Sequence, residues 1–248
     1  MKSLEKRVTI RKYTDENVGD ELLNRLLSLS ARTQTMGNLQ LYSVIVTRDE
    51  EKKKELAPAH FNQPMVTQAP VVLTFCADYR RTTLWAENRN ATPGYDNFLS
   101  FVNAATDVLL YMQTFCNLAE EEGLGYCYLG TTIYNPQSII KTLGLPQLVM
   151  PIATITLGWP AEQPPLTHRL SLASFIHQEI YCDYTPTSIN EFYTEKEQLQ
   201  ENIDMVKLNN KDTLAQVYTD LKYTKEGNES MSENLLKALK QQGFLKDE

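Results

Sequence analysis

The sequence predicts an α+β or α/β fold in which one sheet is covered by helices. Four apolar or β-branched stretches, near residues 41, 71, 125 and 150, indicate strands, and helical patterns lie between them. The longest helical pattern covers residues 98–122, where apolar side chains recur at three- and four-residue steps around a broad face. Such a helix is expected to be buried on more than one side and to end at Gly123, which favours a left-handed C-cap.

Length, composition and charge narrow the class of protein. A chain of 248 residues can bury a substantial core, and its 42% apolar and 22% charged residues are ordinary for a globular protein. The net charge of -7 argues against nucleic acid or an anionic membrane as the main partner. The first residues lack the apolar core of a signal peptide, and no run approaches the roughly 18 apolar residues of a spanning helix. We therefore expect a cytoplasmic protein.

The four cysteines, Cys76, Cys116, Cys127 and Cys182, are dispersed and form no C-x-x-C pair. Three of them sit in apolar segments, which favours buried reduced thiols over disulfides or a metal site. The sequence also lacks a P-loop, H-E-x-x-H, G-x-S-x-G or EF-hand pattern, and no G-x-G-x-x-G follows a strand. No metal ligand and no catalytic side chain is predicted.

Near the N-terminus, Arg7, Thr9 and Arg11 occupy alternate positions. In an extended backbone alternate side chains leave on the same side. Two guanidiniums with forked donors and one hydroxyl are suited to a phosphate. The same alternation is also typical of a solvated strand face, and the pattern alone leaves both interpretations open.

The next elements are a helix and a strand. Residues 14–17 (TDEN) provide capping chemistry for a helix that runs to about Arg32. Residues 31–40 are rich in side-chain amides and hydroxyls and indicate a loop. The β-branched run 41–47 then indicates a strand.

A charged helix is expected over residues 49–57, with its lysine run 52–54 on a solvated face. Residues 60–68 form a polar segment before a buried strand at 70–77. Residues 79–97 indicate an irregular excursion, either a lid facing a substrate or an ordinary surface loop.

In the second half, Asn135 and Pro136 make a good helix start and Gly144 a good stop. A strand is expected over 150–157. Prolines then interrupt the chain up to about residue 187, and so long an arm suits a segment that reaches across a partner chain. From Ser188 the sequence becomes helical and charged, and its last helix is expected over 228–242, ending at Gly243.

Several of these segments resemble one known family. Residues 7–16 (RVTIRKYTDE) resemble the R-x-S-x-R-x-[FY] opening of the nitroreductase superfamily, and residues 37–40 (GNLQ) resemble its loop ahead of the first strand. Three further motifs are similar to the branch of oxygen-insensitive NADPH nitroreductases and FMN reductases: GLGYCYLG at 123–130, LGLP at 143–146 and LGWPA at 157–161. Their order and spacing match over roughly residues 3–172.

The resemblance implies an α+β, nitroreductase-like fold: a central, mainly antiparallel sheet of four to five strands flanked by helices, with a long interface helix and an extended C-terminal arm. Residues 1–172 would form the FMN-binding core, and residues 173–248 the arm and a helical excursion of the same domain. The resemblance further implies a homodimer with one FMN in each of two interfacial sites.

By position, the resemblance assigns Arg7, Thr9 and Arg11 to the phosphate and ribityl end of FMN, with Arg169 returning to the phosphate. It assigns Gln63 to the flavin ring or ribityl chain, and the loop around Gly37 and Asn38 to a contribution across the dimer. The backbone amides of Tyr128, Leu129, Gly130 and Thr131 would lie beside the ring. The chain departs from the branch twice: Thr167 stands where a lysine is usual, and Thr131 where a second glycine is usual.

The activity implied by the resemblance is ping-pong, two-electron hydride transfer from NADPH or NADH through FMN to nitroaromatics, quinones or free flavin. No catalytic side chain is expected, because FMN carries the chemistry. Residues 209–213 (NNKDT) resemble a shortened version of the basic loop that binds the 2′-phosphate of NADPH in this branch, with Lys207 and Lys211 as the candidates. Solvated helix-end lysines are the other interpretation. The alternative functions are an FMN-binding redox sensor or flavin carrier without turnover, and, less favoured, a thiol enzyme using Cys127.

Overall fold

The computed structural model describes residues 2–246, whose contacts group into two compact units. The core unit consists of Met1–Pro165 together with Met231–Glu248, and the helical unit consists of Leu166–Ser230. The last helix, α11 (Lys225–Gln241), begins in the helical unit and ends in the core unit. The domain division at residue 172 remains a prediction.

The described part of the core unit contains a four-stranded sheet in the order β1-β2-β4-β3. Its strands are β1 (Tyr42–Thr47), β2 (Val71–Asp78), β3 (Gly125–Leu129) and β4 (Val149–Gly158). Each neighbouring pair is antiparallel. The α+β class, the antiparallel sheet and the strand positions are thereby confirmed.

Strand β4 carries a proline although it lies inside the sheet. The register between β2 and β4 shifts between Phe75 and Cys76, so that Cys76 faces Pro151 at an irregular step of the ladder. Proline cannot donate a ladder hydrogen bond, and such irregular steps are where a sheet tolerates it. Both strands are buried along their whole length.

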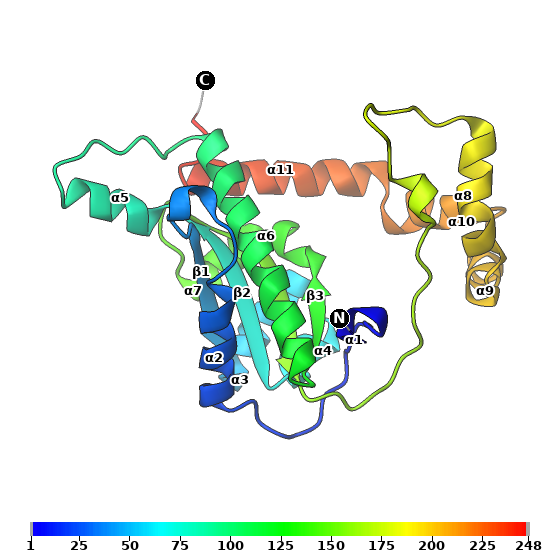
Figure 1. Cartoon of the computed structure of the whole chain (residues 1–248), viewed down its shortest axis with the longest axis horizontal. Helices are drawn as coiled ribbons and strands as arrows, with labels where there is room; N and C mark the ends of the chain where they lie inside the picture. The colour runs from blue at the N-terminus through cyan, green and yellow to red at the C-terminus, as the bar shows by residue number, and fades with distance from the viewer. Residues whose placement is uncertain (1, 247–248) are drawn as a thin grey trace. The chain divides into compact units, whose positions relative to one another are not determined.

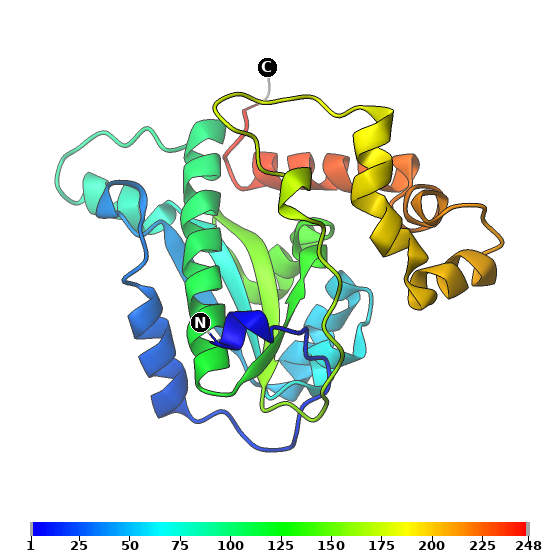
Figure 2. The same cartoon turned by 45° about the vertical axis from the view of Figure 1, so that its right-hand side comes forward.

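One face of the sheet is covered by α6 (Phe98–Glu121), with α2 (Asp20–Ser30) packed beside it (Figures 1 and 2). Asn97 caps α6, because its side chain accepts a hydrogen bond from Ser100 N. The apolar face of α6 enters the main core through residues such as Val108, Phe115 and Ala119. The predicted long helix is confirmed, but in the single chain some of its apolar residues, such as Leu99, are exposed, so burial on more than one side stays a prediction.

The second group of core-unit helices packs against β3 and β4. It comprises α3 (Glu50–Leu56), η2 (Ala57–His60), α4 (Pro64–Gln68) and α7 (Pro136–Leu143). A second apolar cluster joins these helices to β3 and includes Leu56, Val66, Leu129 and Ile139. Gly144 ends α7 with φ +63°, as its position predicted.

Three local expectations were wrong. Helix α2 starts at Asp20 after Gly19, not within residues 14–17, because Tyr13 pairs with Pro160 and Thr14 N donates to Trp159 O at 2.9 Å, which keeps this stretch extended. Lys53 is not solvated: it is 6% exposed and its Nζ donates to Ala69 O at 2.9 Å. The excursion at 79–97 opens with a regular helix, α5 (Arg80–Glu87).

The remaining elements are short or belong to the helical unit. In the core unit they are α1 (Lys2–Glu5), η1 (Met36–Asn38) and η3 (Gly130–Ile133). The helical unit follows the expected pattern of an irregular arm, interrupted by η4 (Leu172–Ser174), and then α8 (Pro186–Gln198), α9 (Gln200–Leu208), α10 (Leu214–Val217) and the π-helical turn η5 (Tyr218–Lys222). Across residues 2–246, none of the helices has the length and apolarity needed to cross a bilayer.

Candidate functional site

The N-terminal segment lies along the β3 edge of the sheet. Ile10 N donates to Tyr126 O at 3.0 Å. A Cβ built on Gly125 would lie 2.6 Å from Ile10 Cγ1, so only glycine lets the Ile10 side chain lie this close to the backbone of β3. The packing brings Arg11 next to Cys127, in the middle of β3.

The two arginines of this segment have different surroundings. Arg7 Nε donates to Glu120 Oε1 at 2.7 Å, and its Nη2 donates to Glu120 Oε2 at 2.5 Å and to Asn117 Oδ1 at 2.7 Å. Donation of these hydrogen bonds to the Glu120 carboxylate raises the pKa of Arg7. Thr9 and Arg11 are instead exposed. Arg7 is therefore bound to side chains of α6, whereas Thr9 and Arg11 face solvent.

The backbone around Arg11 is fixed by a carboxylate. Arg11 N and Lys12 N donate to Glu162 Oε1 at 2.6 and 3.0 Å, and these bonds lower the pKa of Glu162. Burial raises the pKa of the Cys127 thiol, and the nearby Arg11 offsets this only in part. A thiol that is 3% exposed and protonated at neutral pH is a poor nucleophile, which argues against the thiol-enzyme interpretation.

A histidine joins two of the predicted flavin segments. His60 Nδ1 lies 2.8 Å from Thr131 Oγ1, which links the end of η2 to the η3 turn after β3. Phe61 and Asn62 follow with φ of +54° and +53°, and this double left-handed turn leads to Gln63, the half-buried N-cap of α4. Gln63 and Thr131 are thus carried by two turns that meet at His60.

Sequence reasoning missed the role of His60, which is fully buried. Burial lowers the pKa of His60 to about 4, so its ring is neutral near pH 7. Within residues 2–246 its second ring nitrogen, Nε2, has no hydrogen-bond partner. One feature of the sequence could have indicated that His60 is buried: it stands between apolar residues that belong to the second apolar cluster, Ala57, Ala59 and Met65.

The loop with Gly37 and Asn38 lies elsewhere in the core unit. Both residues are left-handed, with φ of +55° and +57°, and the loop is anchored on α6 because Asp107 accepts hydrogen bonds from Met36 N at 2.9 Å and Leu41 N at 3.1 Å. This loop leads into β1, at the opposite edge of the sheet from β3. One chain does not bring it to Arg11 or Thr131. Asp107, a carboxylate on the apolar helix, was also missed.

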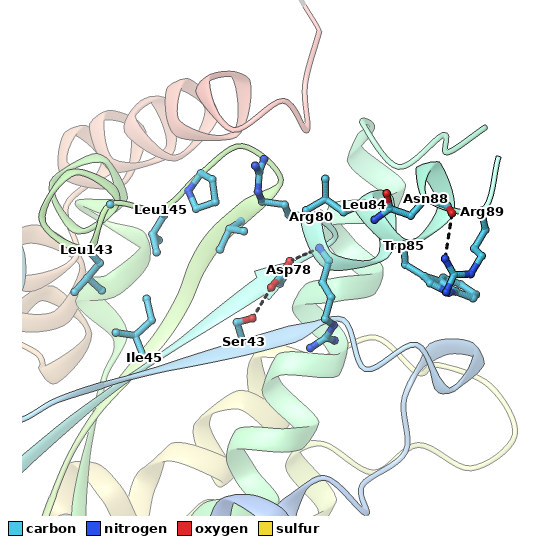
Figure 3. Close-up of a pocket in the computed structure, with 14 residues that line it drawn as sticks. Ser43, Ile45, Asp78, Arg80, Leu84, Trp85, Asn88, Arg89, Leu143 and Leu145 are labelled. Carbon is cyan, nitrogen blue, oxygen red and sulfur yellow. Dashed lines mark hydrogen bonds between the residues drawn. The ribbon is translucent and has the colours of Figure 1, made fainter. Parts of the chain in front are cut away.

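A cavity of about 640 Å³ also lies away from the predicted flavin residues (Figure 3). It is bordered by the start of β1, the end of β2, α5 and the end of α7, and Asp78 at its centre accepts hydrogen bonds from Ser43 Oγ and Arg81 N. Arg80 and Arg89 give it a positive rim. None of the predicted site residues lines this cavity.

In the helical unit, the predicted phosphate ligand Arg169 bonds to its own segment. Its Nη1 donates to Thr167 Oγ1 at 2.5 Å and to His168 O at 3.1 Å. Thr167, which replaces the usual lysine, therefore holds the neighbouring arginine. The return of Arg169 to a flavin phosphate stays a prediction.

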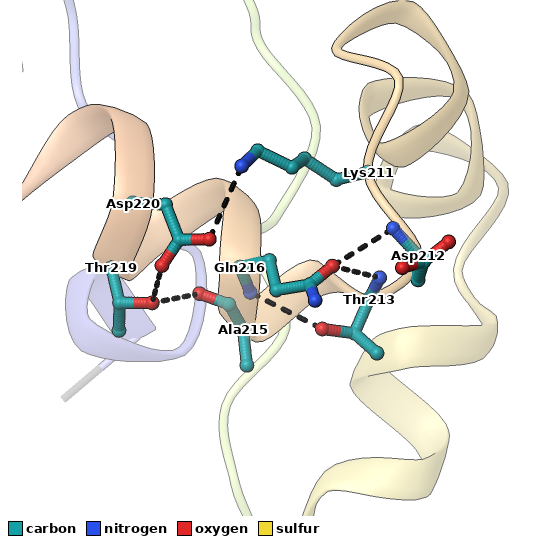
Figure 4. Close-up of polar contacts among 7 residues, drawn as sticks. All are labelled: Lys211, Asp212, Thr213, Ala215, Gln216, Thr219 and Asp220. Carbon is teal, nitrogen blue, oxygen red and sulfur yellow. Dashed lines mark hydrogen bonds and ion pairs between the residues drawn. The ribbon is translucent and has the colours of Figure 1, made fainter.

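The two candidate NADPH lysines differ in their partners. Lys211 Nζ lies 3.2 Å from Asp220 Oδ2, and this bond lowers the pKa of Asp220 (Figure 4). Lys207 is exposed beside a hollow of about 300 Å³ that Glu197 and Asp212 also line. The loop is shaped by a capping box between Thr213 and Gln216. Acidic side chains thus accompany both lysines.

Comparison with known proteins gives consistent results. The Nitroreductase family model matches residues 4–159. An FMN reductase [NAD(P)H] of Bacillus subtilis is 34% identical over 188 residues, covering 74% of each chain. An oxygen-insensitive NADPH nitroreductase of Salmonella typhimurium is 31% identical over 173 residues, covering 70% of each. A crystal structure from Bacteroides fragilis superposes with a TM-score of 0.98 at 58% identity, covering 99% of this chain and 100% of the other.

Proposed function

Because the chain belongs to the nitroreductase family, we propose that it is a flavin-dependent NAD(P)H oxidoreductase with FMN as its cofactor. The relatives named as FMN reductase and NADPH nitroreductase support this activity. The observation that carries the proposal for this chain is the meeting of three segments at β3: the N-terminal segment, the turn before Gln63 and the turn at Gly130–Thr131. Each of the three was predicted to bind flavin.

The residues present fit a flavin mononucleotide. The exposed guanidinium of Arg11 and hydroxyl of Thr9 offer donors to a phosphate, while Gln63 offers a carboxamide to the ring or ribityl. A Cβ added at Gly130 would meet Tyr128 Cε1 at 3.6 Å, an ordinary van der Waals contact, so the Tyr128 ring borders the space beside this backbone. We assign the phosphate chiefly to Arg11, since Arg7 would have to leave Glu120 to reach it.

When bound, FMN supplies the hydride chemistry, accepting from NAD(P)H and passing two electrons to a nitroaromatic, a quinone or free flavin. The side chains of this protein bind and orient. Arg11 and Thr9 would hold the anionic end of FMN, and the amides of Gly130 and Thr131 would donate to its ring. No described side chain is assigned as a nucleophile or proton relay.

We also propose that the active form is a homodimer built on α6. The side of α6 away from the sheet exposes Phe98, Leu99, Val102, Leu109 and Leu110, each at least 41% exposed in the single chain. Apolar side chains at this helical spacing form a stripe that a second copy of α6 would cover. A dimer would also give the Gly37–Asn38 loop a route to the flavin of the other subunit.

Anaerobic stopped-flow spectroscopy tests the activity. The FMN-loaded protein is mixed with NADPH and, separately, with NADH while the 350–550 nm band is followed. Rapid bleaching that nitrofurazone or a quinone reverses is the expected result. A bound flavin that neither nucleotide bleaches would favour the sensor or carrier, and absence of FMN binding after reconstitution would overturn the proposal.

The phosphate assignment is tested by Arg11→Ala, with Lys12→Ala as the matched control one position away. Loss of a charge-assisted hydrogen bond should raise the Kd for FMN about 10- to 100-fold. Lys12→Ala should leave it within about twofold, because Lys12 is an exposed cation whose side chain has no role in the proposal. Equal retention of FMN by both variants would contradict the role of Arg11.

A further inference from the structure

His60 is an unusual side chain to find in this core. It lies against the apolar cluster formed by α3, η2, α4, β3 and α7, which includes Leu56, Val66, Leu129 and Ile139. A neutral imidazole carries one N–H and one lone pair. Nδ1 faces the Thr131 hydroxyl. The other ring nitrogen, Nε2, is buried and has no hydrogen-bond partner in the described chain.

A buried, unpaired nitrogen lowers the stability of the folded state. A leucine of similar volume would fill the site without that cost, so packing alone does not explain a histidine. What the histidine adds is its hydrogen-bonded ring nitrogen, Nδ1, which lies 2.8 Å from Thr131 Oγ1. The bond connects two turns that are otherwise far apart in sequence, one ending at Gln63 and the other containing Gly130.

Thr131 makes this connection informative. Its side chain is half-buried and is directed to His60. A glycine in its place would give the turn more backbone freedom and would offer His60 no hydroxyl to bond. Asn135 Nδ2 donates to Ala59 O at 3.1 Å, which adds a second tie between the same two turns.

We propose that His60 is a positioning residue: through the Thr131 hydroxyl it fixes the η3 turn, and so sets the direction in which the Gly130 and Thr131 amides face the flavin. The inference rests on the proposed function, which places FMN beside these amides. His60 touches neither substrate nor cofactor in this role. It acts only through Thr131.

Variants separate this role from packing. His60→Leu keeps the volume and removes the bond, and Thr131→Val keeps the shape and removes the hydroxyl. His60→Asn places an amide near the Nδ1 position and should restore the bond. Thr67→Val is the matched control, because the Thr67 hydroxyl is also hydrogen-bonded, but to Pro64 O at 3.1 Å within α4 and not to another turn.

The first readout uses the flavin-free protein. Amide hydrogen exchange at residues 130–133 should become at least about fivefold faster in His60→Leu and in Thr131→Val, and should stay at the wild-type rate in His60→Asn and Thr67→Val. Exchange in β2 and β4 should not change, which excludes general loosening. Wild-type rates at 130–133 in His60→Leu would overturn the proposal.

The second readout uses the FMN-loaded protein. His60→Leu and Thr131→Val should each shift the reduction potential and the absorption maxima of the bound flavin and raise its Kd about tenfold, and the double variant should add nothing to either. Additive effects, or an unchanged potential with altered exchange, would overturn the positioning role. Failure of the proposed function has a different signature, since wild-type protein would then bind no FMN while the exchange difference persisted.

Discussion

The core unit and the helical unit are stabilised in different ways. In the core unit every residue of β2 and β4 is buried, and the predicted flavin segments are tied together by short contacts such as His60–Thr131. In the helical unit α8 has no buried residue, and Leu172 and Ile180 are 70% and 72% exposed. If the proposed sites are right, we expect cofactor binding to depend on packing in the core unit and the choice of nucleotide to depend on surface charge in the helical unit. Substitutions should have large effects in the first and small, salt-sensitive effects in the second.

The largest effect is expected where the Ile10 side chain packs directly on the backbone of Gly125. Gly125→Val would place side-chain atoms inside the contact with Ile10, whose Cγ1 is 2.6 Å from an added Cβ. Overpacking at such a site should cost about 3 kcal/mol, the upper end of its usual range. The N-terminal segment should also move away from β3, and FMN affinity should fall with it. Urea unfolding and flavin titration measure the two effects.

Gly94→Ala is the control for this prediction, because nothing lies within 4 Å of a Cβ added at Gly94. Its stability should stay within about 0.5 kcal/mol of wild type. If Gly125→Val were as stable as Gly94→Ala and retained FMN, the N-terminal segment would not depend on its contact with β3. The contrast between the two units would then lose its main support.

A second core-unit effect depends on pH. Burial alone lowers the pKa of His60 to about 4, whereas an unfolded histidine titrates near about 6.5. The unfolded state therefore binds a proton first, so the free energy of unfolding should fall as the pH drops below about 6.5 and stop falling below about 4. Between pH 7 and pH 5 the loss should be about 2 kcal/mol.

The measurement is the difference between wild type and His60→Leu in urea unfolding from pH 7 to pH 4. Other titrating groups contribute equally to both proteins and cancel in the difference. His60→Leu should be at least as stable as wild type at pH 7 and should gain on it steadily toward pH 5. A constant difference across this range would show that His60 is not held neutral by burial.

The sequence predicted the parts of the molecule that depend on local patterns. Alternation and periodicity located the four strands and α6, and turn chemistry located Gly144 and Gly243. It could not predict contacts made after the chain folds back. The alternation predicted that Arg7 and Arg11 leave the backbone on the same side. It could not predict that Glu120, 113 residues from Arg7, would bind Arg7 and not Arg11. His60 was missed for the same reason, because its importance appears only when Thr131 is beside it.

The two units can be compared directly through one ion pair in each: Arg7–Glu120 in the core unit and Lys211–Asp220 in the helical unit. The pair of Arg7 and Glu120 is partly buried, with side chains 25% and 12% exposed, and Glu120 accepts several bonds from one guanidinium. Glu120→Gln should therefore cost about 1 kcal/mol or more, with little dependence on salt. Thermal unfolding at low and high ionic strength measures both. A cost that vanished at high salt would make this pair equivalent to a surface contact.

The smallest effect is expected at the pair of Lys211 and Asp220, whose side chains are 27% and 47% exposed. Asp220→Asn should change stability by less than about 0.5 kcal/mol, because exposed pairs contribute little. If Lys211 is part of the nucleotide site, freeing its charge should lower the KM for NADPH about two- to fivefold, leave the KM for NADH unchanged, and lose the gain at high salt. Lys225→Ala, which removes an exposed cation of another ion pair, serves as the control. Equal changes for both nucleotides would place Lys211 outside the 2′-phosphate site, and the preference for NADPH would then have to come from another group.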